Sequence, residues 1–274
     1  MPNRSQIKTE ARHLIRTGTV SPLAATAVAL LIAFVLEHIS DLVEYGSVFF
    51  SYQFQAVYLE AVLTGDYSVL PTLLNGGSGI YSPMSLFFTV LVSLFTSVLY
   101  GGYYIYCMGI RQGLQMPLTT LADGLSVAGK LIWCNILIGV KTFLWSLLFF
   151  IPGVIAAYRY RFAVYNVLTD PSLTAGEAIQ LSCRQTYGMK GSLFMLDLSF
   201  IGWNLLSSVL NSVFVWMKFY SMAALVSFAL QLWVLPYLTF SDLAYFEQGQ
   251  RRLGRPPYGG NDPYSYGGNS PWEL

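Results

Sequence analysis

Long apolar runs alternate with short polar segments along the chain. A helix needs about 20 mostly apolar residues to cross about 30 Å of hydrocarbon. Runs near or above that length occupy residues 20–36, 83–108, 131–150, 154–169, 192–217 and 222–246. These runs are continuous rather than alternating, which disfavours a membrane β-barrel. The pattern therefore predicts an all-α fold, a polytopic transmembrane helical bundle of about six spans.

The fourth run, residues 154–169, is the least typical span. It is short, it carries Arg159 and Arg161, and it follows Ile151-Pro152-Gly153. Proline removes a backbone donor and glycine relaxes the backbone, so we expect the preceding helix to end at this tripeptide. If the fourth run does not cross, the chain has five spans and a re-entrant segment.

The N-terminal segment is predicted to form an amphipathic helix at the membrane surface. Four basic residues recur there at every fourth position: Arg4, Lys8, Arg12 and Arg16. Apolar residues fall beside them at helical spacing: Ile7, Ala11, Leu14 and Ile15. We expect the apolar face to lie on the membrane, with the cations over anionic lipid headgroups. A pure topology signal would need the same residues, and that alternative stays open.

A second surface helix is predicted between the fourth and fifth runs. Asp170-Pro171 ends the preceding helix. Thr174-x-x-Glu177 is the pattern of a capping box, and Gly188 follows as a stop after Tyr187. Residues 48–61 have apolar positions at helical spacing, which predicts either an outer interfacial helix or an extension of the first span, ahead of a glycine-rich loop at residues 75–79.

The distribution of basic residues predicts the orientation. Most of the 15 lysines and arginines lie before the first run, at residues 111–130 and 184–190, or at residues 251–255. The long segment 37–84 has none. By the positive-inside rule, both termini face the cytoplasm. We divide the chain into a basic amphipathic helix (1–18), a transmembrane domain (19–248) and a tail rich in Pro, Gly and Tyr that is predicted to be disordered (249–274).

Charged residues inside apolar runs are the candidate polar cluster, because such groups usually pair or line a polar cavity. They are Lys141, Arg159, Arg161, Asp197 and Asp242, with Glu37 at the edge of the first run. One hypothesis pairs Lys141 with an acidic neighbour such as Asp197. In the alternative, which we favour, Lys141 extends to the interface and Asp197 caps a helix near it.

The composition narrows the function classes. The chain has 54% hydrophobic and 11% charged residues and a net charge of +1, which argues against a nucleic-acid partner. Three cysteines without a C-x-x-C pair and two distant histidines predict no metal and no cofactor. Neither a nucleophile elbow nor a phosphate loop occurs in the sequence, so we predict that the protein is not an enzyme.

The second half carries a series of motifs in a specific order. They are Trp145-x-Leu-Leu-x-x-Ile-Pro-Gly-Val-Ile, Tyr158-x-Tyr160, Asp170-Pro171, Glu177-Ala178-Ile179, Lys190-Gly191, Leu193-Phe194, Leu196-Asp197-Leu198-Ser199-Phe200-Ile201-Gly202-Trp203 and Trp233-x-x-Pro236-Tyr237. With Arg4-x-x-x-Lys8 and Ala11-Arg12, this series resembles the bacterial integral membrane family called domain of unknown function 975, up to about Phe246. The layout is also similar to the membrane domain of some glycerophosphodiester phosphodiesterases.

The resemblance implies a helical bundle in the bacterial cytoplasmic membrane and no assigned activity. Family members often carry Lys soon after Ile-Pro-Gly, where this chain has Ala156. We expect a non-enzymatic lipid-binding or membrane-organising accessory protein. Its partners would be membrane lipids, in particular anionic ones, and a membrane protein that the sequence does not identify.

Two other functions stay open. One is a small transporter or channel that uses the intramembrane charges, and the other is an intramembrane lipid-modifying enzyme. A water-accessible cavity around Lys141, Arg159 and Asp197 would favour transport, whereas a paired cluster would favour the accessory role.

Overall fold

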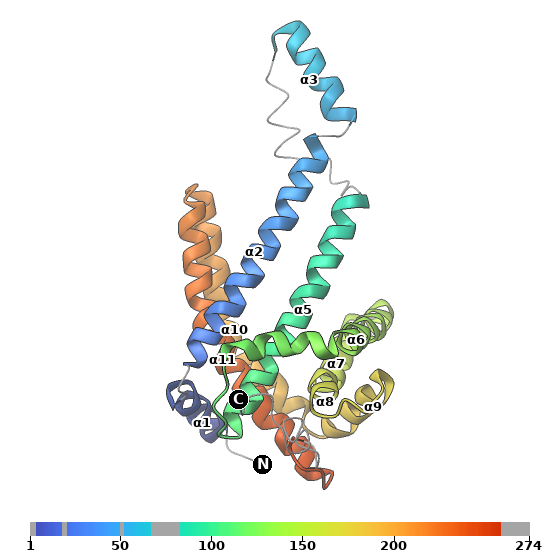
Figure 1. Ribbon diagram of the computed structural model, residues 1–274, viewed down its shortest axis with the longest axis vertical. Coiled ribbons are helices and arrows are strands. Elements are labelled where there is room, and N and C mark those ends of the chain that lie inside the picture. The colour runs from blue at the N-terminus through green and yellow to red at the C-terminus, as the bar shows by residue number, and fades with distance from the viewer. Residues whose placement is uncertain (1–3, 18–20, 50–51, 67–82, 259–274) are drawn as a thin grey trace. The chain divides into compact units, whose positions relative to one another are not determined.

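The computed structural model describes residues 4–17, 21–49, 52–66 and 83–258, and these residues form helices and connecting turns without strands (Figure 1). The helices are α1 (Arg4–Thr17), α2 (Pro22–Phe49), α3 (Tyr52–Thr64), α5 (Pro83–Arg111), the 3-10 helix η1 (Leu118–Val127), α6 (Ala128–Leu148), α7 (Phe150–Tyr160), α8 (Ala163–Thr169), α9 (Ala175–Gln185), α10 (Lys190–Trp216) and α11 (Tyr220–Arg252). The predicted all-α fold is confirmed.

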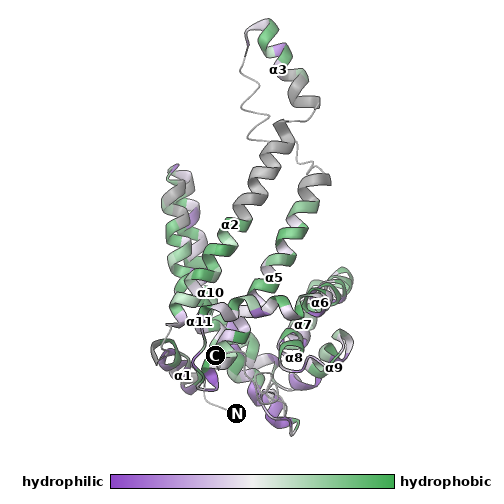
Figure 2. Cartoon of the chain, viewed as in Figure 1, coloured by the Kyte–Doolittle hydropathy of each residue, from purple (hydrophilic) through white to green (hydrophobic). Residues whose placement is uncertain are grey.

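Four helical segments are long and apolar enough to cross a membrane: Phe87–Arg111, Leu118–Leu148, Lys190–Phe214 and Leu225–Arg252. Hydrophobic residues dominate α10, and hydrophilic residues are frequent in α1 (Figure 2). The first predicted span appears as the shorter apolar segment Pro22–Leu36 of α2. The fourth forms two short helices, α7 and α8, which lack the length of a span. By length, four of the six predicted spans are therefore supported among the described residues.

The chain divides into two compact units. The first contains residues 1–30 and 97–274, and the second contains residues 31–96, so α2 and α5 each continue from one unit into the other. In the second unit, α3 confirms the helix expected near residues 48–61. The side chain of Glu37 and the loop at residues 75–79 lie outside the described residues.

The core of the first unit is built around the C-terminal half of α5. Tyr103, Tyr106 and Cys107 are fully buried there, in one cluster with residues of α8, α10 and α11. The helix η1 lies unusually close to α5, because a Cβ on Gly102 would come within 2.0 Å of the Leu121 carbonyl oxygen. Only a residue without a side chain permits this approach.

The helices α6 and α7 form a hairpin with a one-residue turn. Phe149 is extended, with φ −162° and ψ 152°, and α7 begins at Phe150. The predicted break at residues 151–153 is therefore misplaced, because Pro152 lies in the first helical turn, where its missing N–H has no intrahelical acceptor to lose. Gly153 lies against α6, where a Cβ would be 2.1 Å from the Ser146 Oγ atom. The side chains at the turn, including Phe150, are among the most exposed apolar ones.

The predicted surface helix is confirmed as α9. Its N-cap Thr174 accepts from the backbone N–H of Glu177, and the Glu177 carboxylate accepts from the backbone N–H of Thr174 at 2.8 Å. The helix ends at Gln185, two residues earlier than expected, and Gly188 has φ 72°. The apolar face, with Ala178 and Ile179, is buried against α6 and α8.

The helices α10 and α11 pack along each other as a second hairpin (Figure 1). α11 extends through Arg252, so the helix enters the segment assigned to the tail by four residues. Tyr258 then donates a hydrogen bond to Glu247. Residues 259–274, the rest of the predicted tail, lie outside the described residues.

Candidate functional site

Three of the five predicted cluster residues come together as one ion-paired group. The Arg161 Nη1 atom donates to Asp197 Oδ2 at 2.6 Å, and Nη2 donates to Asp197 Oδ1 at 2.9 Å. Arg161 Nε and Nη2 also donate to Asp242 Oδ2, at 3.1 and 2.8 Å. Arg161, Asp197 and Asp242 are called the Arg161 triad below. One planar guanidinium thus satisfies two carboxylates, an arrangement that a lysine could not reproduce.

Three separate elements contribute to the Arg161 triad. Arg161 lies in the turn between α7 and α8, Asp197 in the third turn of α10, and Asp242 in α11. Tyr158 donates to Asp197 at 2.7 Å, and its ring lies 5.7 Å from the Arg161 guanidinium carbon. Burial and this hydrogen bond raise the pKa of Tyr158 to about 12. Burial opposes the charge of Arg161, but the two carboxylates outweigh it and raise the pKa of the guanidinium.

The other two predicted members, Lys141 and Arg159, do not join the triad. The ion pairs of the described residues do not include Lys141, which lies on α6. The hypothesis that Lys141 pairs with Asp197 is wrong, because Asp197 binds Arg161. The Arg159 side chain is exposed, and its backbone carbonyl accepts from Ser182 at 2.8 Å. Residues two positions apart on a helix point about 200° apart, and Arg161 continues α7 as its C-cap in helical conformation, so Arg159 and Arg161 face different surroundings.

The amphipathic helix α1 packs on the protein with its apolar face. Ile7, Ala11 and Ile15 are buried in the main core cluster, and α1 lies against α11. The expectation that this face lies on the membrane is therefore wrong. The apolar stripe finds a protein surface to cover, which removes it from water as effectively as lipid would.

The basic face of α1 lies over aromatic rings of the last two helices. Lys8 Nζ lies 5.2 Å from the ring centre of Phe200, and the Arg12 guanidinium carbon lies 5.7 Å from that of Tyr237. A cation over a ring keeps its N–H donors available for another partner. Arg4 lies in the first turn of α1 and Arg16 near its end, and their side chains are outside the described set.

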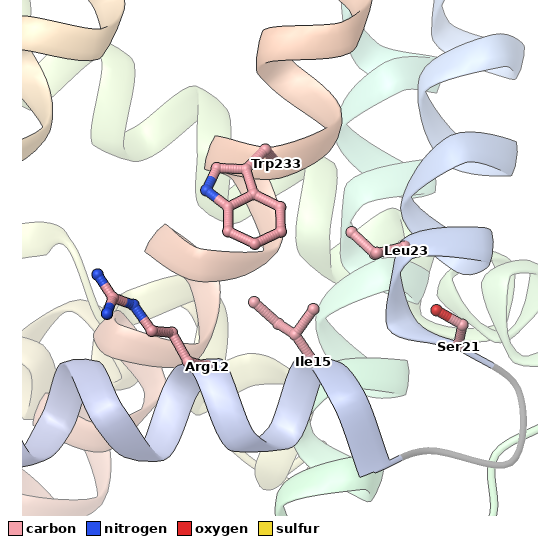
Figure 3. A pocket seen from close by; sticks show the side chains of 5 residues that line it. All are labelled: Arg12, Ile15, Ser21, Leu23 and Trp233. Carbon is pink, nitrogen blue, oxygen red and sulfur yellow. The ribbon is translucent and has the colours of Figure 1, made fainter.

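A crevice of about 400 Å³ opens beside the basic face of α1. Its lining comes from three helices: Arg12, Ile15, Ser21, Leu23 and Trp233. Figure 3 shows Arg12 and Ile15 rising from α1 and Trp233 descending from α11, with Ser21 and Leu23 at the start of α2. It is called the Arg12 crevice below. The sequence predicted Arg12 as a lipid contact, but nothing in it placed Trp233 beside Arg12.

A second network centres on Arg111, which sequence reasoning treated only as a topology signal. The Arg111 side chain is 4% exposed and donates to both Glu247 oxygens, with Nε at 2.5 Å from Oε1. It also pairs with Glu10 of α1 at 3.1 Å. Burial and the nearby Glu247 carboxylate raise the pKa of Tyr258, the further donor to Glu247. Apart from its place at the end of an apolar run, the sequence held no signal for this network.

Further contacts join the polar segments between the helices. Arg255 lies 3.6 Å from Asp170, and the Lys130 ammonium donates to the carbonyl of Pro171. Together with the Arg111 network, these contacts bring the N-terminal helix, residues 111–130, residues 170–190 and the end of α11 into one polar region. No group of three or more His, Cys, Asp and Glu that could hold a metal occurs among the described residues.

Comparison with known proteins gives one family. Residues 147–252 match the model of the family described as "Protein of unknown function (DUF975)". Over these residues, which are less than half of the chain, the sequence is similar to the DUF975 family. The match covers α7 to α11, and so it contains the whole Arg161 triad. No curated protein and no solved structure shows a significant match to the chain.

The family match confirms the resemblance over the second half of the chain. The earlier motifs, Arg4-x-x-x-Lys8 and Ala11-Arg12, lie outside the matched residues, and for them the resemblance stays a prediction. The same holds for the similarity to the glycerophosphodiester phosphodiesterase membrane domain.

Proposed function

We propose that this protein is a non-enzymatic membrane protein of the bacterial cytoplasmic membrane, with both termini in the cytoplasm. It binds anionic lipid at the cytoplasmic interface and assists or organises membrane-protein partners. The observation that carries this proposal is the position of α1, whose cations lie where the apolar stretch of α2 begins and that of α11 ends.

The position of α1 follows from its contacts. Arg12 lies over Tyr237, and in α11 the residues before Tyr237 are mainly apolar whereas those after it are mainly polar. The apolar segment Pro22–Leu36 starts a few residues after α1 ends. A basic helix at such a boundary is placed to attract anionic headgroups, at about 1 kcal/mol for each cation near the surface.

The arrangement of the Arg161 triad favours the accessory role over transport. Asp242 follows Tyr237 by five positions, about 7.5 Å further along α11 towards Arg252. Asp197 likewise lies nearer to the polar start of α10 than Phe200 does. Since Lys8 and Arg12 rest on Phe200 and Tyr237, the triad lies on the polar side of α1. Paired charges in that place fit a structural joint better than a path across the hydrocarbon.

Extraction of the protein in native-lipid discs tests the proposal. Mass spectrometry of the discs should find anionic lipid enriched over the bulk membrane. The enrichment should fall in the double variant Lys8→Gln/Arg12→Gln. The matched control is Arg251→Gln/Arg252→Gln, which removes the same charge from exposed residues at the end of α11 and should retain the enrichment.

The same discs report on partners. A stoichiometric membrane protein in the discs would support the organising role and identify the pathway. Discs of the wild-type protein with neither enriched anionic lipid nor a partner would contradict the proposal. A defined soluble small molecule in their place would favour transport.

A further inference from the structure

The Arg12 crevice has the shape and the lining of a small-ligand site. Ligand pockets commonly measure about 300–1,000 Å³, and the Arg12 crevice has about 400 Å³. Its walls come from the end of α1, the start of α2 and the middle of α11, all within the first unit. A site fixed by three helices holds its donors in place more firmly than a single surface helix does.

The polar groups around the crevice are donors. Arg12 is exposed, and the ion pairs of the described residues do not include it, so its guanidinium charge has no carboxylate partner there. The side chain of Trp233 is 46% exposed, and its indole N–H has no hydrogen-bond acceptor among the described residues. Ser21 adds a hydroxyl. A guanidinium fork with two further donors matches the oxygens of a phosphate group.

The remaining walls of the crevice are apolar, and they favour a phospholipid over a soluble phosphate as the ligand. Ile15 is 5% exposed and forms one wall, Leu23 forms another, and the Trp233 ring closes a third side (Figure 3). Tryptophan with one apolar and one polar edge is typical of the headgroup level of a membrane. A soluble phosphate would use the donors alone, whereas a phospholipid would use the donors and the apolar walls together.

We infer that the Arg12 crevice binds the phosphate of an anionic phospholipid headgroup, with Arg12 as the charge partner and Trp233 as a second donor. The volume accommodates the phosphate and glycerol part, and the acyl chains would continue outside the crevice along the apolar residues of α2 and α11. This inference rests on the proposed lipid-binding function and assigns it to one site.

Native mass spectrometry of the full-length protein in detergent, titrated with phosphatidylglycerol, measures the binding. The wild-type protein should retain one phosphatidylglycerol more tightly than it retains phosphatidylcholine. Arg12→Gln should weaken retention about tenfold, since it removes a charge-assisted hydrogen bond. Trp233→Phe keeps an aromatic ring but removes the indole N–H and the five-membered ring that carries it, so it should weaken retention about threefold. The control Arg251→Gln should bind as the wild type does.

The outcomes separate the site from the general function. If anionic lipid is enriched in native-lipid discs but Arg12→Gln and Trp233→Phe both retain phosphatidylglycerol normally, the proposed function stands and the assignment to the crevice is overturned. If the wild type shows no preference for anionic lipid, both fail. Displacement of the lipid by excess inorganic phosphate would show that the site takes a soluble anion instead. Trp233→Phe keeps the test decisive should Arg12→Gln fail to fold.

Discussion

At the scale of single residues, the Arg161 triad shows how one guanidinium can join three elements. Arg161 and Asp242 are mostly buried, at 19% and 10% exposed, and Asp197 is 32% exposed. Breaking a buried ion pair from one side is costly, because the remaining charge loses its partner without regaining its hydration. Here the loss of Arg161 would leave two such carboxylates side by side.

We therefore predict that Arg161→Met lowers the free energy of unfolding by about 2–4 kcal/mol. The matched control is Arg159→Met, two positions away and exposed, which should change it by less than about 0.5 kcal/mol. Thermal unfolding in detergent can be followed by the reactivity of the buried thiols of Cys107 and Cys134. The triple variant Arg161→Met/Asp197→Asn/Asp242→Asn should recover much of the loss. Equal melting temperatures for the two arginine variants would contradict the structural role of the triad.

All three triad residues could be identified from the sequence as charges inside apolar runs, but their partners could not. Pairing depends on how each helix is rotated about its axis, and a rotation of 100° exchanges Arg161 for its neighbour. The sequence also placed Lys141 near the middle of a predicted span, and so Lys141 rather than Arg161 was predicted as the partner of Asp197. The ion pairs of Arg111 were not predicted at all, since a cation at the end of an apolar run is sufficiently explained as a topology signal.

At the scale of elements, local signals were reliable where the chemistry is local. The capping box of α9 was recognised from Thr174 and Glu177 alone, because its hydrogen bonds join residues three apart. The 3-10 helix η1 had no such signal, since it depends on the close approach of Gly102 in α5 to Leu121. The turn at Phe149 comes before the break predicted at residues 151–153, for a similar reason. Contact between Gly153 and Ser146 decides where α7 folds back, and no local rule describes that contact.

The capping box gives a prediction for α9. Thr174→Ala should lower the free energy of unfolding by about 1 kcal/mol, since it exposes an unpaired backbone N–H. The hydrogen bonds from the Thr174 backbone N–H and hydroxyl lower the pKa of Glu177 below its ordinary 4.5. Because the folded-state pKa is the lower one, this stabilisation is present above pH 4.5 and is lost as the pH falls below it.

Unfolding measured between neutral and acidic pH tests the cap. Glu177→Gln keeps an acceptor but cannot titrate, so its stability should depend less on pH below 4.5 than that of the wild type. Identical pH profiles for the two proteins would show that the Glu177 carboxylate makes no contribution.

The hairpin of α6 and α7 gives a second prediction at this scale. Gly153→Ala would place a Cβ 2.9 Å from the Ser146 Cα atom, so the two helices must separate. We expect a loss of about 1–3 kcal/mol in unfolding free energy. Gly139→Ala in α6 meets no atom within 4 Å, and alanine favours the helix, so this control should be neutral or slightly stabilising. A neutral Gly153→Ala would mean that α7 does not pack on α6 as described.

At the scale of the whole molecule, the chain contacts agree with the orientation that the basic residues predict. Four segments distant in sequence and assigned to one side of the membrane are linked by Arg111–Glu10, Arg111–Glu247 and Arg255–Asp170. The positive-inside rule counts charges near span ends and needs no tertiary contact, so a prediction of the orientation was available from the sequence. The number of helices long enough to span was not, because the apolar run 154–169 gives no sign in the sequence that it folds as parts of two short helices, α7 and α8.

Cysteine accessibility in intact cells tests the orientation. In a background without the three native cysteines, Lys218→Cys places a thiol at the exposed turn between α10 and α11, and Arg184→Cys places one on the exposed face of α9. The two positions lie at opposite ends of α10, a helix of 27 residues and therefore about 40 Å long.

If α10 crosses the membrane with its polar start in the cytoplasm, a membrane-impermeant maleimide should label Lys218→Cys in whole cells. It should label Arg184→Cys only after the cells are opened. Labelling of both thiols in whole cells, or of Arg184→Cys alone, would contradict the orientation, and with it the cytoplasmic lipid site beside α1.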